Sequence, residues 1–107
     1  MEKTGVYETL RQVGYELPAV GKPGGLFKPV MRHHDILYVS GQGTIRDGQV
    51  LVSGKLGKSC SIAKGREAAV HCVLNALSQL DAFLGDLNQI DSVIKILGFV
   101  ASEEGFN

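Results

Sequence analysis

The clearest apolar pattern in the chain lies between Ser61 and Leu84. Apolar side chains recur there at steps of three, four and seven residues, which places them along one side of an α-helix. They are Ile62, Ala69, Val73, Leu77, Leu80 and Leu84. Ser61 can cap the start of this helix and Gly85 its end, while Gly65 weakens the first turns. We therefore predict a helix over Ser61–Leu84 whose apolar stripe packs on one face of a sheet.

Shorter apolar runs predict the strands of that sheet. Asp47-Gly48 is a pair that suits a tight type I′ hairpin turn, and the strand that returns from this turn is expected over Gln49–Val52. Another, Ser92–Val100, is apolar at almost every position, which is typical of a strand that is covered on both faces. Pro29 confines the earliest segment to a sheet edge. The expected extended segments are Leu26–Arg32, Ile36–Val39, Gln49–Val52 and Ser92–Val100.

The order of these elements predicts the α+β class, with one long helix on a mixed sheet and a single domain over residues 1–107. A short amphipathic helix is expected over Thr4–Val13, with Thr4 as its N-cap. A loop, Gly21–Gly25, follows it. The strand Ser92–Val100 is so apolar that a further element is expected to cover or pair it.

Charge and cysteine content exclude several classes of protein. The 107 residues carry eleven basic and eleven acidic side chains, so the formal net charge is zero, which argues against a nucleic-acid partner. Cys60 and Cys72 would lie about 18 Å apart on one helix and are expected as free thiols in a reducing compartment. The chain starts without the apolar run of a signal peptide, and no segment is long enough to span a bilayer. We expect a cytoplasmic protein with no membrane partner.

Candidate chemistry is sparse. His33 and His34 are adjacent and would point to opposite faces of a strand, and His71 has only Glu67 at helical spacing, so no metal site is expected. The segment Ser40–Gly43 is more informative, because it follows an apolar strand and contains two glycines. Backbone N–H groups at such a strand end can face a pocket and hold a small anion such as a carboxylate.

A set of motifs in fixed order extends this picture over nearly the whole chain. They are Leu17-Pro18, Phe27-Lys28-Pro29, the strand ending in Ser40-Gly41-Gln42, Asp47-Gly48, Gly54-Lys55-Leu56-Gly57, Ala68-Ala69, Gly85-Asp86-Leu87 and Val93–Val100. In this order they resemble the Rid (YjgF) family of reactive-intermediate deaminases, also labelled endoribonuclease L-PSP, in the branch with an extra N-terminal helix.

The resemblance implies a chorismate-mutase-like α+β fold that assembles as a homotrimer. It also implies hydrolysis of 2-imino acids and their enamine tautomers to 2-keto acids and ammonia, with no cofactor and no metal. By position, Ser40, Gly41 and Gln42 match the ligand-binding strand. Phe27 matches a pocket aromatic that is usually Tyr, and Phe106 falls near the end of the pocket-lining segment.

The more serious departure from the family is an absence. Family members continue past Asn107 with a second helix and further strands, which carry the arginine that grips the substrate carboxylate and an acidic residue that positions water. The resemblance thus implies a C-terminally truncated domain whose catalytic residues are unknown. Whether the chain is an enzyme stays open. The alternatives are a trimeric small-ligand-binding or regulatory module and an endoribonuclease or translation inhibitor, against which the neutral charge counts.

Overall fold

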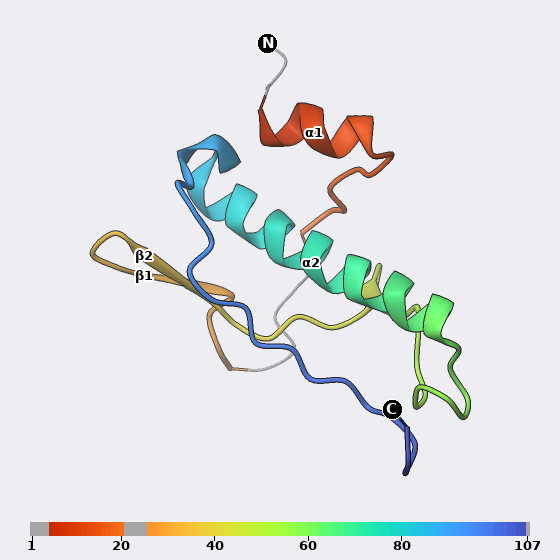
Figure 1. Cartoon of the computed structure of the whole chain (residues 1–107). Helices are drawn as coiled ribbons and strands as arrows, with labels where there is room; N and C mark the ends of the chain where they lie inside the picture. The colour runs from red at the N-terminus through yellow and green to blue at the C-terminus, as the bar shows by residue number, and fades with distance from the viewer. Residues whose placement is uncertain (1–4, 21–25, 107) are drawn as a thin grey trace.

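One long helix, α2 (Ile62–Leu84), organises the chain, and the other elements lie around it (Figure 1). This computed structural model describes residues 5–20 and 26–106. Ser61 caps the helix, since its side-chain oxygen accepts a hydrogen bond from the Lys64 N–H at 3.2 Å. Gly85 ends it at a φ of 82°, a left-handed conformation that glycine adopts readily. The predicted helix, its cap and its end are therefore confirmed.

Two hairpins precede α2. Strand β1 (Val30–His33) pairs antiparallel with β2 (Ile36–Val39), and β3 (Ile45–Arg46) pairs antiparallel with β4 (Gln49–Val50). The turn of the second hairpin has positive φ at both Asp47 (53°) and Gly48 (77°), so the predicted tight turn is confirmed.

The two hairpins form separate two-stranded sheets, whereas the sequence predicted one mixed sheet. The strand expected over Gln49–Val52 also ends two residues early, at Val50. A side chain of α2 explains the interruption between β2 and β3. The amide of Asn75 donates to the carbonyl oxygens of Gly43 and Ile45, each at 2.9 Å, so the helix occupies acceptors that a continuing ladder would use.

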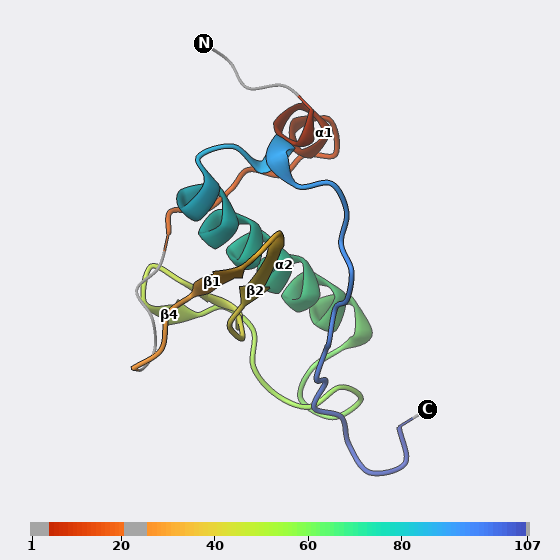
Figure 2. The same cartoon turned by 90° about the vertical axis from the view of Figure 1, so that its left-hand side faces the viewer.

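The strand predicted over Ser92–Val100 is wrong. Residues 91–100 are extended but make no backbone hydrogen bond to any described residue, and they run past α2 as an unpaired segment (Figures 1 and 2). Their apolar side chains face solvent, with exposed fractions from 70% at Leu97 to 88% at Phe99. A strand exists only beside a neighbour that satisfies its N–H and C=O groups, and none of the described residues takes that position.

After residue 100 the backbone bonds to Leu56, and the side chain of Leu56 in turn contacts α2. The Leu56 N–H donates to Ala101 O at 3.0 Å, and the Glu103 N–H donates to Leu56 O at 2.9 Å. The side chain of Leu56 lies against Gly65 in α2, where an added Cβ would come within 2.4 Å of Leu56 Cδ2. Gly65 thus makes room for Leu56, which accounts for a glycine in the first turns of the helix.

The buried core of the described residues is small and differs from the predicted stripe. Leu74 and Ser78 are the buried residues of α2, whereas Val73 is 50% exposed. Ala69 is exposed as well, and Leu77 and Leu80 are half-buried. The reason is that α2 packs on a two-stranded hairpin, β1 and β2, which covers a narrower face than a full sheet would. The buried apolar residues are Val30, Cys60, Leu74 and Leu87.

The predicted N-terminal helix is confirmed as α1 (Val6–Gln12), although Thr4, its expected cap, lies outside the described residues, as does the loop Gly21–Gly25. The Tyr7 hydroxyl donates to the Asp81 carboxylate and accepts from the Leu87 N–H at 2.7 Å. The Val6 N–H donates to Asn88 Oδ1 at 3.0 Å. These bonds fasten α1 to the end of α2 and to the 3₁₀ turn η1 (Leu87–Gln89).

Within the described parts of the chain, no helix combines the length and the apolar character needed to cross a membrane.

Candidate functional site

The residues expected to bind a ligand begin where β2 ends. The Ser40 N–H donates to Pro29 O at 2.8 Å, and the Ser40 hydroxyl donates to Lys28 O at 2.5 Å. Ser40 therefore closes the open end of the first hairpin. Its two bonds connect the motif Ser40-Gly41-Gln42 with the motif Phe27-Lys28-Pro29. Because its proton is used on Lys28, the hydroxyl oxygen keeps its lone pairs for a donor from outside.

The two residues after Ser40 leave hydrogen-bonding groups available. The Gly41 N–H has no partner among the described residues, and an added Cβ at Gly41 would meet nothing within 4 Å. The Gln42 side-chain amide donates to Ser40 O at 3.2 Å, which leaves its carbonyl oxygen unused. Asn75 holds the following residue, Gly43, on α2. The strand end is thus a stretch of backbone, held at Ser40 and Gly43, whose N–H groups at Gly41, Gln42 and Gly43 have no partner among the described residues.

The two aromatic residues expected at the site are placed differently. Phe27 precedes Lys28, whose carbonyl bonds Ser40, so Phe27 comes from the segment beside the strand end; it is 46% exposed. Phe106 lies elsewhere, over Gly57, where an added Cβ would come within 2.9 Å of its ring. Both views place the C-terminal end of the chain away from the end of β2 (Figures 1 and 2). The segment that carries Phe27 is joined to Ser40 through the carbonyls of Lys28 and Pro29, and Phe106 is not brought to it.

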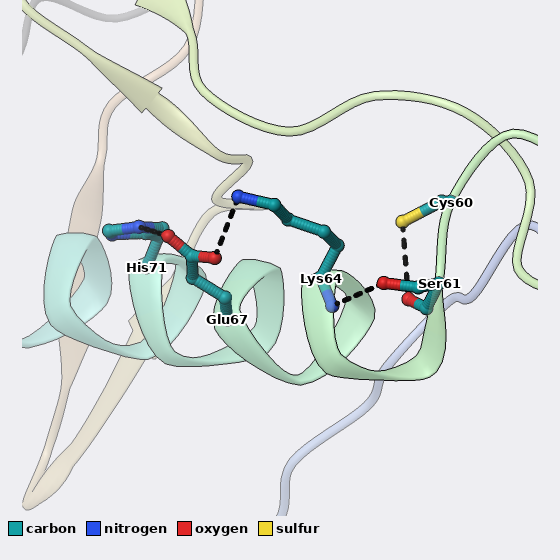
Figure 3. Close-up of polar contacts among 5 residues, drawn as sticks. All are labelled: Cys60, Ser61, Lys64, Glu67 and His71. Atoms are coloured by element: carbon teal, nitrogen blue, oxygen red, sulfur yellow. Dashed lines mark hydrogen bonds and ion pairs between the residues drawn. The ribbon is translucent and has the colours of Figure 1, made fainter.

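Sequence reasoning missed a second polar group, centred on Arg46 and His71. Arg46 Nη2 lies 3.2 Å from His71 Nδ1, and His71 Nε2 lies 3.8 Å from Glu67 Oε1. Glu67 in turn pairs with Lys64 at 3.3 Å, so three side chains of α2 lie in a row along the helix (Figure 3). The four-residue spacing of Glu67 and His71 was visible in the sequence. Arg46 comes from the second hairpin and gave no local signal.

Both cysteines are free thiols, as expected. Cys60 is buried directly before α2, and its Sγ lies 3.6 Å from Ser61 O (Figure 3). Partial burial raises the pKa of the Cys72 thiol, because burial disfavours the thiolate. A thiol shifted in this direction is a poor nucleophile at neutral pH. Among residues 5–20 and 26–106, no three His, Cys, Asp or Glu side chains group closely enough to hold a metal ion.

Two solved structures resemble this arrangement closely. A protein of unknown function from Agrobacterium tumefaciens, Atu1372, superposes with a TM-score of 0.83 and 36% identity over 94% of this chain. A protein from Shewanella oneidensis MR-1, described as a candidate endoribonuclease, superposes with a TM-score of 0.75 and 31% identity over 80% of this chain. The chain has the YjgF-like (L-PSP-like) fold. The α+β fold class predicted from the sequence is therefore confirmed.

One curated protein is also similar to this chain in sequence. Protein TCP17 of Trypanosoma cruzi is 35% identical over 101 residues, which cover 94% of this chain. The chain spans 63% of that relative and 62% and 57% of the Agrobacterium and Shewanella proteins. No family model matches the chain.

Proposed function

We propose that this chain forms part of a hydrolase that converts 2-imino acids and their enamine tautomers into 2-keto acids and ammonia. The observation that carries the proposal is the strand end at Ser40–Gln42 within a YjgF-like fold, where the Gly41 N–H has no partner among the described residues and the space beside the Gly41 Cα is open. The substrate is a small molecule with a carboxylate, and a backbone N–H at a glycine is a suitable donor to it.

The reaction itself asks little of the protein. Water adds to the C=N carbon to form a carbinolamine, the nitrogen takes up a proton, and the C–N bond breaks to release ammonia and leave the keto group. In this proposal the Gly41 N–H holds a carboxylate oxygen, the Ser40 oxygen accepts a hydrogen bond from the imine or the water, and Phe27 covers the apolar side chain. In this proposal the protein positions the substrate and the water and stabilises the charge that develops during the reaction.

Lys28 is a basic residue whose backbone contacts this strand end. Its carbonyl bonds the Ser40 hydroxyl at 2.5 Å and the residue is exposed, whereas Arg32 is tied to the turn of the first hairpin through His34 O at 2.9 Å. A lysine supplies a point charge and lacks the planar fork of an arginine. We therefore expect the 107 residues alone to accelerate imine hydrolysis little or not at all, and a YjgF-like chain that also carries the carboxylate-binding arginine to be active.

A homotrimer is part of the same proposal. Support comes from the row of exposed apolar side chains in residues 91–100 and from the small buried core, because small domains gain stability by burying such surface against other subunits. The proposal also places the protein in the cytoplasm, where pyridoxal-phosphate enzymes that act on amino acids release imines.

The test compares two proteins: the 107-residue chain and a chimera extended with the C-terminal residues of the Trypanosoma cruzi relative. An amino-acid dehydratase generates the imine, and the appearance of the keto acid is followed against the uncatalysed rate. The chimera is expected to accelerate the reaction, and light scattering is expected to give three subunits.

Substitutions in the chimera assign the site. Ser40→Ala is expected to lower the acceleration at least about tenfold, the loss typical of a positioned polar group. Ser53→Ala, at an exposed serine outside residues 91–100, is the matched control and is expected to leave the rate unchanged. A folded trimeric chimera that leaves the uncatalysed rate unchanged would refute the deaminase. In that case saturable binding of a 2-keto acid would favour the non-catalytic binding module.

An endoribonuclease is the second candidate, because the similar Shewanella structure carries that description. The formal net charge of zero counts against it, since single-stranded RNA is usually held by a basic groove with aromatic side chains. Incubation with a labelled RNA decides the point: cleavage that Ser40→Ala abolishes in the chimera would favour the ribonuclease over the deaminase.

A further inference from the structure

A cavity of about 550 Å³ lies on the side of α2 where α1 ends, apart from the strand end at Ser40. It is lined by Arg46 from β3, by Glu67 and His71 from α2, and by Tyr15 and Glu16 from the segment after α1. It shares no lining residue with the site proposed above, so what it binds goes beyond the proposed function.

The guanidinium of Arg46 is the unusual group in this cavity. Its one polar contact among the described residues is with His71 Nδ1, at 3.2 Å from Nη2. Its Nε is buried and has no hydrogen-bond partner in the same part of the chain. Arginine is always protonated and only donates, so His71 Nδ1 must be the acceptor and the His71 proton sits on Nε2. The acceptor is thus a ring nitrogen and not a carboxylate, and Arg46 forms no ion pair with any described Asp or Glu.

Neighbouring charges do not supply the missing anion. The Glu67 carboxylate lies 3.3 Å from Lys64 Nζ and 3.8 Å from His71 Nε2 (Figure 3), whereas Arg46 contacts the other ring nitrogen, Nδ1. Arg11, which also lines the cavity, pairs with Glu8 at 2.5 Å. A partly buried charge without a counter-ion is costly, and an unpartnered buried donor usually marks a place where an ion or ligand belongs.

We propose that this cavity binds a small monocarboxylate with a short apolar body, held by the guanidinium of Arg46 beside His71. A carboxylate matches the planar donor edge of arginine with two parallel hydrogen bonds. Glu16 and Glu67 at the lining repel a dianion such as phosphate more strongly than a monoanion. Val70 and Leu74 provide the apolar surface for the carbon body. A volume of about 550 Å³ lies in the range of small-molecule sites.

Nuclear magnetic resonance of the three histidines tests this site directly. The protein with ¹³C-labelled histidine is titrated with propionate, and separately with inorganic phosphate, at constant pH and ionic strength. Propionate is expected to shift the His71 ring signals along a saturable curve with a dissociation constant in the millimolar range, and phosphate is expected to bind more weakly. His33 and His34 lie at the turn between β1 and β2 and serve as internal controls, because their ring signals are expected not to shift.

Variants assign the binding to Arg46. Arg46→Gln is expected to weaken propionate binding at least about tenfold, and Arg66→Gln, at an exposed position of α2, is the matched control that leaves it unchanged. If circular dichroism shows that Arg46→Gln does not fold, Arg46→Lys keeps the charge, loses the planar edge and is expected to weaken binding as well. Ser40→Ala is expected to leave binding unchanged, which separates this site from the proposed deaminase.

Three results would overturn the proposal. The first is a parallel, non-saturating shift of all three histidines, which means a general effect of the salt. The second is tighter binding of phosphate than of propionate. The third is an Arg66→Gln variant that weakens binding as much as Arg46→Gln does.

Discussion

Removal of one oxygen atom from Tyr7 is expected to loosen the attachment of α1 to the rest of the chain. The Tyr7 hydroxyl donates to the Asp81 carboxylate and accepts from the Leu87 N–H at 2.7 Å, and Leu87 is only 1% exposed. A hydrogen bond to a charged group contributes about 1.5–3 kcal/mol and a neutral one about 0.5–1.5 kcal/mol. Tyr7→Phe is therefore expected to lower the free energy of unfolding by about 2–4 kcal/mol.

That loss is large for a domain of this size, whose whole stability is about 5–15 kcal/mol. Urea denaturation followed by circular dichroism measures it: with a slope of about 2 kcal/mol per molar, the midpoint falls by about 1–2 M. Tyr15→Phe is the matched control, because Tyr15 is 41% exposed, and it is expected to change stability by less than about 0.5 kcal/mol. A Tyr7→Phe protein that unfolds at the wild-type urea concentration would show that this bridge does not stabilise the fold.

Four further outcomes follow from single residues. Ser78→Ala removes the donor to Pro18 O at a buried position and is expected to cost about 1–2 kcal/mol in urea denaturation. Gly85→Ala places a Cβ at a φ of 82° and is expected to cost about 1 kcal/mol, which thermal melting would detect. Ile96→Lys is expected to change the stability of the 107-residue chain by less than about 0.5 kcal/mol, because Ile96 is 77% exposed; a loss of several kcal/mol would mean that the segment is covered in solution. Since the pKa of Cys72 is raised in the folded chain, the folded state holds the thiol proton more tightly, so stability falls as pH rises past the unfolded pKa. Iodoacetamide should accordingly modify Cys72 more slowly in the folded chain than in urea.

Elements specified by neighbouring residues were predicted well. The start of α2 depends on Ser61 and its end on Gly85, and both signals lie within one turn of the helix they delimit. The turn between β3 and β4 depends on the Asp47-Gly48 pair alone. Such signals can be read from the sequence without knowledge of the tertiary structure, because a cap or a tight turn is stabilised by residues next to it.

Predictions that needed a distant partner were less successful. The apolar run at residues 92–100 has the composition of a buried strand, but pairing depends on a neighbour that composition does not name. The buried face of α2 was likewise misjudged at Val73, since its burial depends on how wide the covering sheet is. At the candidate site, Ser40 and Phe27 were assigned through the family resemblance and stay predictions, whereas Arg46 and His71 meet across 25 residues and left no pattern to find.

The docking of α1 also depends on residues that are synthesised much later than the helix itself. Val6 binds Asn88, 82 positions later, and Tyr7 binds the amide of Leu87, 80 positions later. A ribosome adds about 5–20 residues per second, so α1 waits for several seconds after its own synthesis before its partners exist. An isolated helix of seven residues is unstable in water over that interval. Helix α1 is therefore synthesised well before the residues that hold it, and it becomes ordered only after they have been added.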